Sequence, residues 1–537
     1  MFRYIAKKIN FQKLKNENDR QNEARDKEKR TPIPADLNKN RETLQNIFCN
    51  SHDVIYCEFN FGRRMSKRAS LIYIDGMVDR DALEKNVLEP LQDGTAISKP
   101  DGAIDYTSMR MLKNSILHVS DTLIVDTLEE LLDHLMSGSA ILFIDGFQEA
   151  LVINAKKWEH RNISEPETES VVRGPREGFT ENLKTNLTLL RRKIKDTDFC
   201  IESLKIGDKT NTDISIAYIK NTAPSQLLEE VKARLKKIRT DSIIDSGYIE
   251  QFIEDAPYSI YSTIANSEKP DNTAAKILEG RVAILVDGSP FALTVPMLFI
   301  ESFQVSEDYY SRTVFASFIR FLRFVSYIIS VLSPAIYVAL TVFHQELIPT
   351  QLLISIASGR EPVPFPAVIE AAIMIVTFDI LREAGVRLPK PVGSAISIVG
   401  ALVLGQSAVS AGLISPIMVI VVAATAIASF VVPSQTDSGT IMRYIYLILA
   451  GLAGGFGIIM GLLINLIYIT SITSFGMPYF SPIAPLVPSD LKDTVIRMPL
   501  WTVLKQPKSL TAKASAANGS RPSRSKKGTE EPSQKRG

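Results

Sequence analysis

The stretch PVPFPAVIEAAIMIVTFDILREAGVRLPKP, residues 362–391, decides how this chain is divided. It opens with three prolines in five residues, continues as an apolar run that carries Glu370 and Asp379, and ends in a charged cluster. A carboxylate in hydrocarbon is costly, so such residues usually face a bundle interior or a water-filled path. We therefore predict a helical membrane domain after Arg323, built around this segment, and a soluble region before it.

Charged residues are unevenly distributed over the 537 residues. They crowd the first three-fifths of the chain, whereas residues 391–436 and 444–489 contain no Asp, Glu, Lys or Arg. Length alone suggests about three domains. The formal net charge of +2 says little beside this distribution, and we expect no nucleic-acid partner.

Cysteine and histidine carry no signature of a disulfide framework or a metal site. Cys49, Cys57 and Cys200 are irregularly spaced, which fits a reducing cytosol, and the five histidines lack HExxH or HxH spacing. No GxxxxGK[ST], GxGxxG or GxSxG motif occurs. We expect no cofactor, no metal and no enzymatic activity.

Residues 1–40 hold little that could form a core. They are charged, nearly without large apolar side chains after Leu14, and lack the apolar segment of a signal peptide. We predict a mobile or helical charged arm. The soluble region is then expected to stay in the cytoplasm.

Strand-like and helix-like periods alternate from Glu42 to Arg312, which predicts the α/β class. An internal duplication underlies them: residues 131–153, LLDHLMSGSAILFIDGFQEALVI, align without gaps to residues 273–295, TAAKILEGRVAILVDGSPFALTV. The alignment pairs Gly138 with Gly280, Asp145 with Asp287, and Gly146 with Gly288. We predict two related subdomains, residues 41–165 and 196–311, and interpret each Asp-Gly pair as a type I′ hairpin turn in preference to a binding loop.

A basic connector, residues 166–195, separates the two subdomains. Its sequence VVRGPREGFTENL (171–183) requires an irregular loop before a helix. Arg173, Arg176 and Glu177 are candidates for contact with an anion or a partner subunit. An exposed connector with internal salt bridges is equally compatible with the pattern.

The membrane domain, residues 312–500, holds five apolar segments. Arg312, Arg320 and Arg323 precede a charge-free run of twenty residues, 324–343, which is the length that one helix needs to cross a bilayer. By the positive-inside rule the soluble head faces the cytoplasm. The last apolar run is glycine-rich, and its small-residue spacings predict close helix packing at Gly451, Gly455, Gly457 and Gly461.

The tail, residues 501–537, is basic and predicted to be disordered, with contact to anionic lipid as a second interpretation. Its charge places it in the cytoplasm with the head, so the number of crossings is expected to be even. We choose residues 362–381 as a re-entrant piece, because irregular backbone is allowed where it is buried or lines water.

Two acids in this segment differ in position. Glu370 lies in the first turn of a helix that starts near Pro366, and Asp379, nine residues on, points to the opposite face. We predict a structural ion pair between Asp379 and Arg382. Glu370 is the candidate for a cation path, with a buried carboxylate bonded to a neighbouring helix as the alternative. The further pore candidates are Pro364, Pro366, Met374 and Thr377.

Several long, collinear motifs resemble the A subunits of bacterial spore germinant receptors, the GerA family. They are VVRGPREGFTENL, FIESFQVSEDYYSR (299–312), the segment from Pro364 to Val409, and SPIMVIVVAATAIASFVVPS (415–434). The resemblance covers residues 45–500. This chain departs from the family pattern at Met374-Ile375, where a second acid is common, and at Asp379, where Glu is common.

The resemblance implies a spore inner-membrane protein that works with a transporter-like B subunit and a C-subunit lipoprotein. It further implies that A subunits assemble, as a pentamer in the membrane lipid, into a nutrient-gated cation channel. Two alternatives stay open: a related paralogue that amplifies ion release without its own nutrient sensor, and a scaffold of the germination cluster that conducts nothing.

Overall fold

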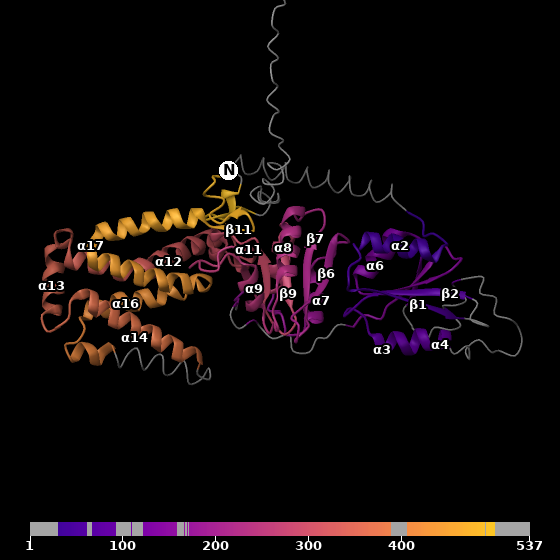
Figure 1. Ribbon diagram of the computed structural model, residues 1–537, viewed down its shortest axis with the longest axis horizontal. Coiled ribbons are helices and arrows are strands. Elements are labelled where there is room, and N and C mark those ends of the chain that lie inside the picture. Colours follow the sequence, from indigo (N-terminus) through magenta and orange to yellow (C-terminus); the bar gives the residue numbers. More distant parts are fainter. Residues whose placement is uncertain are drawn as a thin grey trace, which may run out of the picture.

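The computed structural model describes residues 31–61, 67–92, 109, 122–157, 166, 169, 171–387, 405–488 and 490–499. Two sheet-containing units and a bundle of helices follow one another along the long axis, in the order of the chain (Figure 1). The predicted α/β head and helical C-terminal half are confirmed.

The first unit is a five-stranded antiparallel sheet in the order β1-β2-β4-β5-β3. Its strands are β1 (Val54–Phe61), β2 (Lys67–Ile74), β3 (Thr122–Val125), β4 (Ala140–Ile144) and β5 (Ala150–Ile153). Helices α2 (Leu37–Ile47) and α6 (Leu128–Met136) cover one face, and the run α3 (Arg80–Leu83), η2 (Glu84–Leu88) and α4 (Glu89–Gln92) covers the other (Figure 1). Successive side chains of β4 alternate between the two cores, Ile141 and Phe143 toward α2 and α6, Leu142 and Ile144 toward α3 and α4.

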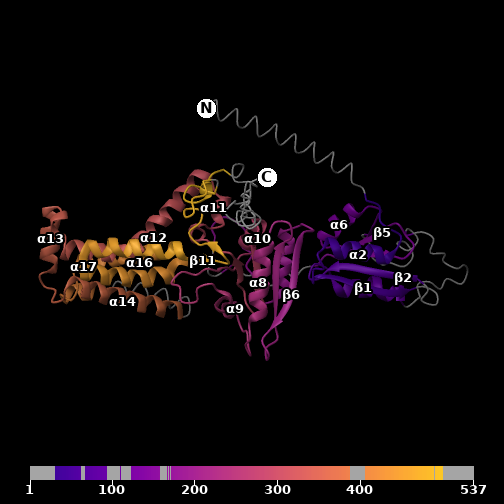
Figure 2. The ribbon, with the colours of Figure 1, turned by 45° about the horizontal axis from the view of Figure 1, so that its top comes forward.

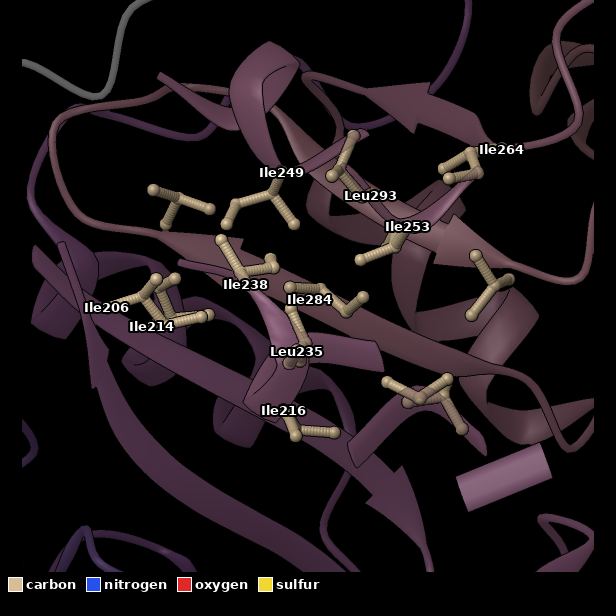
Figure 3. Packing of buried hydrophobic residues seen from close by; sticks show 14 of the residues in the cluster. Ile206, Ile214, Ile216, Leu235, Ile238, Ile249, Ile253, Ile264, Ile284 and Leu293 are labelled. Carbon is tan, nitrogen blue, oxygen red and sulfur yellow. The ribbon is translucent and has the colours of Figure 1, made fainter. Parts of the chain in front are cut away.

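The second unit repeats this plan with the strand order β6-β7-β9-β10-β8. Its strands are β6 (Phe199–Ile206), β7 (Thr212–Ile219), β8 (Ala265–Ser267), β9 (Val282–Val286) and β10 (Ala292–Val295). Helices α7 (Leu183–Lys193) and α10 (Pro270–Leu278) cover one face, and α8 (Ser225–Lys237) and α9 (Ser246–Ile253) cover the other. Figure 3 shows the second core, where Leu235, Ile249 and Ile253 meet strand residues such as Ile216 and Ile284.

The aspartates of the two Asp-Gly pairs make the same kind of hydrogen bond in both units. Asp145 accepts a hydrogen bond from the backbone N–H of Leu37 at 3.4 Å, and Asp287 accepts one from Leu183 at 3.1 Å. Each aspartate thus holds the start of a helix, α2 or α7, whose free N–H groups favour an acceptor. The predicted duplication is confirmed, and α7 packs as part of the second unit.

The predicted turn type was wrong, although the hairpins exist. The connection from β4 to β5 has five residues, 145–149. Gly146 has a positive φ of 89°, whereas the φ of Asp145 is negative. A type I′ turn needs positive φ at two successive central positions. The aspartate adopts ordinary backbone geometry here because its side chain serves the adjacent helix.

The two units are joined by a buried ion pair. Arg191 of α7 donates from Nε to Asp53 at 2.7 Å and from a terminal nitrogen to the second Asp53 oxygen at 3.1 Å. The Arg191 side chain is 1% exposed and that of Asp53 is 7% exposed. Ser51 adds a hydroxyl that accepts from Arg191 and from the backbone of Ile201 in β6. Cys49 and Cys200 form a disulfide beside it, a pairing that their spacing did not predict.

The described part of the helical half contains α12 (Thr313–Val342), α13 (Thr350–Arg360), α14 (Ala367–Arg387), α16 (Pro416–Ser429) and α17 (Thr436–Ser471). Among the described residues, two stretches are long and apolar enough to cross a membrane, Thr313–Val342 and Pro433–Ser471. The sequence predicted irregular backbone in a re-entrant segment, residues 362–381. In the structure the helix α14 begins at Ala367 and continues for 21 residues, so irregular backbone is confined to the residues before Ala367. The length of α14 is about 31 Å at 1.5 Å per residue.

Helix α17 is a helical hairpin. Gly454 has φ 59° and ψ −138°, a conformation that interrupts the helix. A Cβ added to Gly461 would lie 2.7 Å from Leu449 and 2.9 Å from Tyr446, so the second half folds back along the first. The run that the sequence presents as a single apolar segment therefore forms two adjacent helices.

We expect Arg191→Met to lower the free energy of unfolding by about 3–5 kcal/mol, because it leaves Asp53 buried without its partner. Pulse proteolysis of the full chain in urea measures the loss. The double variant with Asp53→Leu should lose less than the sum of the single variants, since neither charge is then stranded. Strict additivity would show that the pair does not couple the units, and Lys209→Met in an exposed pair with Asp241 is the control.

Gly454→Ala should destabilise the helical half by about 1–3 kcal/mol, because only glycine adopts this backbone conformation without strain. The added Cβ would also lie 2.7 Å from Phe343. Gly439→Ala, in the same helix, is the matched control, since its Cβ would meet nothing closer than 3.6 Å. The thermal midpoint of the solubilised full chain measures both. An equal midpoint for the two variants would contradict the hairpin assignment.

Candidate functional site

Glu370 is fully buried in the helical half, at 0% exposure. One carboxylate oxygen accepts hydrogen bonds from the backbone N–H of Ser415 at 2.6 Å and from its hydroxyl at 2.5 Å. Ser415 is the N-cap of α16, so the Glu370 carboxylate lies at the positive end of that helix dipole. The second oxygen lies 3.8 Å from Nε of Arg360 and accepts no hydrogen bond within the described part of the chain.

The other pore candidates lie on the same segment as Glu370. Pro364 and Pro366 are exposed in the stretch before α14. Met374 packs against the helical core, and the Thr377 hydroxyl donates to the carbonyl of Ile373 at 2.8 Å. Their contribution to an ion path stays a prediction.

The charge partner of Asp379 differs from the prediction. Its carboxylate accepts a hydrogen bond from Tyr444 at 2.7 Å and lies 3.6 Å from Arg443, both on α17. Arg382 forms no ion pair with it among the residues described. The i, i+3 spacing made Arg382 the obvious local partner, but Arg443, from a helix packed alongside, supplies the closer cation.

The four small-residue positions lie at close contacts inside one chain. A Cβ at Gly451 would lie 2.9 Å from Val368 of α14. The backbone N–H of Gly455 donates to Nε2 of His344 at 3.1 Å. Gly457 and Gly461 face Leu449 across the α17 hairpin. These contacts explain the glycines without a second subunit.

The connector loop reaches the start of the helical half. Gly174 has a φ of 141°, and a Cβ there would lie 2.7 Å from the ring of Tyr310, just before α12. Arg173 and Arg176 are exposed beside it. Glu177 pairs with Lys193 at 3.0 Å and Arg192 at 3.5 Å. Burial raises the pKa of Glu177, but these two cations outweigh it and hold the pKa below its usual value.

A cavity of about 300 Å³ lies between the two units of the head. Five of its charged lining groups pair with one another, Asp75 with Arg80 at 2.7 Å and with Lys184 at 3.4 Å, and Asp79 with Lys157 at 2.8 Å. No group of three His, Cys, Asp or Glu side chains among the described residues is placed to hold a metal ion.

A buried ionic junction fastens the head to the first helix. Arg320 and Arg323 of α12 both reach Asp308, at 3.1 and 2.8 Å. Arg320 also contacts Asp493, at 2.9 Å, so the segment after α17 joins the same cluster. Arg320 and Asp308 are 0% and 3% exposed.

A second ion pair continues this cluster into the head. Arg281, which precedes β9, is paired with Glu301. Burial lowers the pKa of Lys276 nearby, and Glu301 acts against that shift. Sequence reasoning noted Arg320 and Arg323 only as charges flanking a membrane span. Their acidic partners lie in segments that no spacing rule connects.

The end of the last helix is held by the head as well. Phe475, directly after α17, lies in the core of the second unit with Val231 and Leu235 of α8. Arg234 of α8 lies 4.2 Å from the centre of the Phe475 ring, a cation–π contact. Asp255 accepts a hydrogen bond from the backbone N–H of Phe475. The first and last helices of the bundle are thus both anchored in the same unit.

The sequence matches one known protein family over most of its length. The family described as "Bacillus/Clostridium GerA spore germination protein" matches residues 42–509. The chain belongs to the GerA family. GerA relatives from Bacillus subtilis (strain 168) include spore germination protein KA, 44% identical over 92% of this chain and 90% of its own length. Spore germination protein B1 of the same organism is 40% identical over 88% and 97%.

The GerA family likeness extends to a solved structure. The N-terminal domain of the A subunit of the Bacillus megaterium spore germinant receptor GerK3 is 34% identical, covering 50% of this chain and 98% of that domain, with a TM-score of 0.41. Spore germination protein GerLA of Bacillus cereus is 39% identical over 83% of this chain and 90% of its own.

Asp308→Asn should weaken the attachment of the head to α12, because it removes the carboxylate that pairs with Arg323 and one of the two that pair with Arg320. We expect a loss of about 3–5 kcal/mol in the free energy of unfolding, read by pulse proteolysis of the full chain. Glu307→Gln changes the preceding acid, which forms no ion pair within the described residues, and is the matched control. If both variants resist proteolysis equally, the junction does not hold the head.

Proposed function

We propose that this chain is the A subunit of a nutrient-sensing spore germinant receptor, and that it oligomerises into a cation channel that initiates germination. Membership of the GerA family supports the role in germination. The observation that carries the channel proposal is the fully buried Glu370 carboxylate in a mostly apolar bundle. Ionisable groups in such places commonly mark ion pathways.

Two polar atoms at this site support the proposal. The second carboxylate oxygen of Glu370 and Nε of Arg360 are buried and lie 3.8 Å apart, and neither forms a hydrogen bond in the described part of the chain. Buried polar groups are normally satisfied, so such a group needs an explanation. A site that exchanges its partners during ion passage provides one.

The proposal includes a location and partners. The two apolar stretches fit an integral protein of the spore inner membrane, with the head on the cytoplasmic side. A transporter-like B subunit and a C-subunit lipoprotein would complete the receptor, and a pentamer of A subunits would surround the pore. Glu370, one per subunit, would then form a ring of carboxylates that concentrates cations.

The test is nutrient-triggered potassium release from spores that carry Glu370→Gln. Glutamine keeps an oxygen for the two Ser415 donors but removes the charge, so the fold should be preserved. We expect release to slow about tenfold or more, the effect of losing about 1.4 kcal/mol of stabilisation. Protein level in the membrane is measured in parallel.

Glu383→Gln is the matched control, since this acid lies on the same helix and is 62% exposed in a pair with Arg387. Its release should match that of the unmodified receptor. Unchanged release with Glu370→Gln at normal protein level would make this carboxylate a structural cap of α16 and remove the basis of the channel proposal.

A further inference from the structure

An uncharged aromatic surface lies on the second unit of the head. Ile244, Tyr248 and Phe252 follow one another at intervals of four residues on and before α9, and are 64%, 43% and 50% exposed. Residues four apart share one face of a helix. Tyr258, in the loop after α9, is 99% exposed. We call these four side chains the α9 surface.

The acidic residues next to the α9 surface have partners within the second unit. Asp245 accepts from Ser289 at 2.5 Å, Glu250 from Ser262 at 3.1 Å, and Glu254 from Thr263 at 3.1 Å. Asp255 pairs with Arg234 at 2.5 Å. All four are half-buried and hydrogen-bonded or paired within the unit, whereas the four side chains of the α9 surface are exposed.

The loop that carries Tyr258 is attached to the helical half. Ile260 packs against the core of the bundle. The hydroxyl of Tyr261 donates to Asn465 of α17 at 3.0 Å, and its ring lies 6.2 Å from that of Tyr468. Helix α9 lies at the end of the head nearest the bundle in both views (Figures 1 and 2).

Aromatic contacts show at which position along α12 and α17 the loop is attached. Tyr468 is in the last turn of α17. Phe299, which contacts Tyr261 at 5.9 Å, also contacts Tyr327, one turn inside the charge-free run of α12. The loop therefore lies where both apolar helices approach the head.

We propose that the α9 surface contacts the headgroup and upper acyl region of the lipid bilayer, with Tyr258 inserted there. Tyrosine is enriched at membrane interfaces because its ring is apolar and its hydroxyl is polar. Several exposed apolar side chains gathered next to apolar helices are typical of an interaction surface. The inference rests on the proposed membrane placement of the helices, and it adds a second, peripheral attachment of the head.

The test places single tryptophans in the full chain, after Trp158 and Trp501 are both replaced by phenylalanine. Tyr258→Trp is the reporter, and Phe252→Trp is a second reporter in case the first does not fold. Ile336→Trp reports the bilayer interior, since it lies about 18 Å along α12 from Phe324. Leu123→Trp, half exposed on β3 of the first unit, is the matched control outside the membrane.

Each variant is reconstituted in vesicles of phosphatidylcholine and phosphatidylglycerol, with acyl chains brominated at a shallow or a deep position. We expect the fluorescence of the Tyr258→Trp variant to be quenched about twofold or more above that of Leu123→Trp, and more by shallow than by deep bromine. The Ile336→Trp variant should show the opposite depth preference. This pattern would support the proposal.

Three results would overturn it. Quenching of the Ile336→Trp variant without quenching of Tyr258→Trp and Phe252→Trp would leave the membrane placement intact and place the α9 surface in water. Blue-shifted but unquenched emission from Tyr258→Trp would mean that protein, such as a second copy of the chain, covers the surface. Absence of quenching in the Ile336→Trp variant would overturn the membrane placement and this inference with it.

Discussion

The arrangement of the head and the bundle depends on the two ion pairs that Asp308 forms with Arg320 and Arg323 of α12. Three charges are withdrawn from water at one point, and such a cluster is stable only while every partner is present. Asp493 ties the segment beyond α17 into the same cluster. The head and the bundle thus share one buried set of charges, and neither can shift without exposing or stranding part of it.

The head was largely predictable because its information is local and repeated. Alternating apolar residues predicted the strands, and the gapless alignment predicted that two units share one plan. The turn type escaped prediction because Asp145 and Asp287 hold the starts of α2 and α7, helices more than a hundred residues away in the chain. The residues next to each Asp-Gly pair do not indicate that its aspartate binds the start of a distant helix.

The helical half was predicted in composition but not in path. A charge-free apolar run does not indicate where the chain reverses direction. The α17 hairpin at Gly454 was therefore not predicted, and the glycines around it were interpreted as helix-packing positions. The position of Glu370 in a first turn followed from sequence, and its burial against the neighbouring helix α16 is the arrangement given above as the alternative. Its partner Ser415 did not follow from sequence, because 45 residues separate them. For Asp379, the local rule favoured Arg382, and the neighbouring helix supplied Arg443.

Phe475 imposes an order on biosynthesis. It completes the core of the second unit, yet it follows the last apolar helix in the chain. Chains fold from the N-terminus as they are synthesised, so the second unit emerges about 180 residues before the side chain that closes its core. Until α17 has been made, the position of Phe475 beside α8 is unfilled. The last side chain of this core is therefore contributed by the segment that is synthesised after the whole bundle.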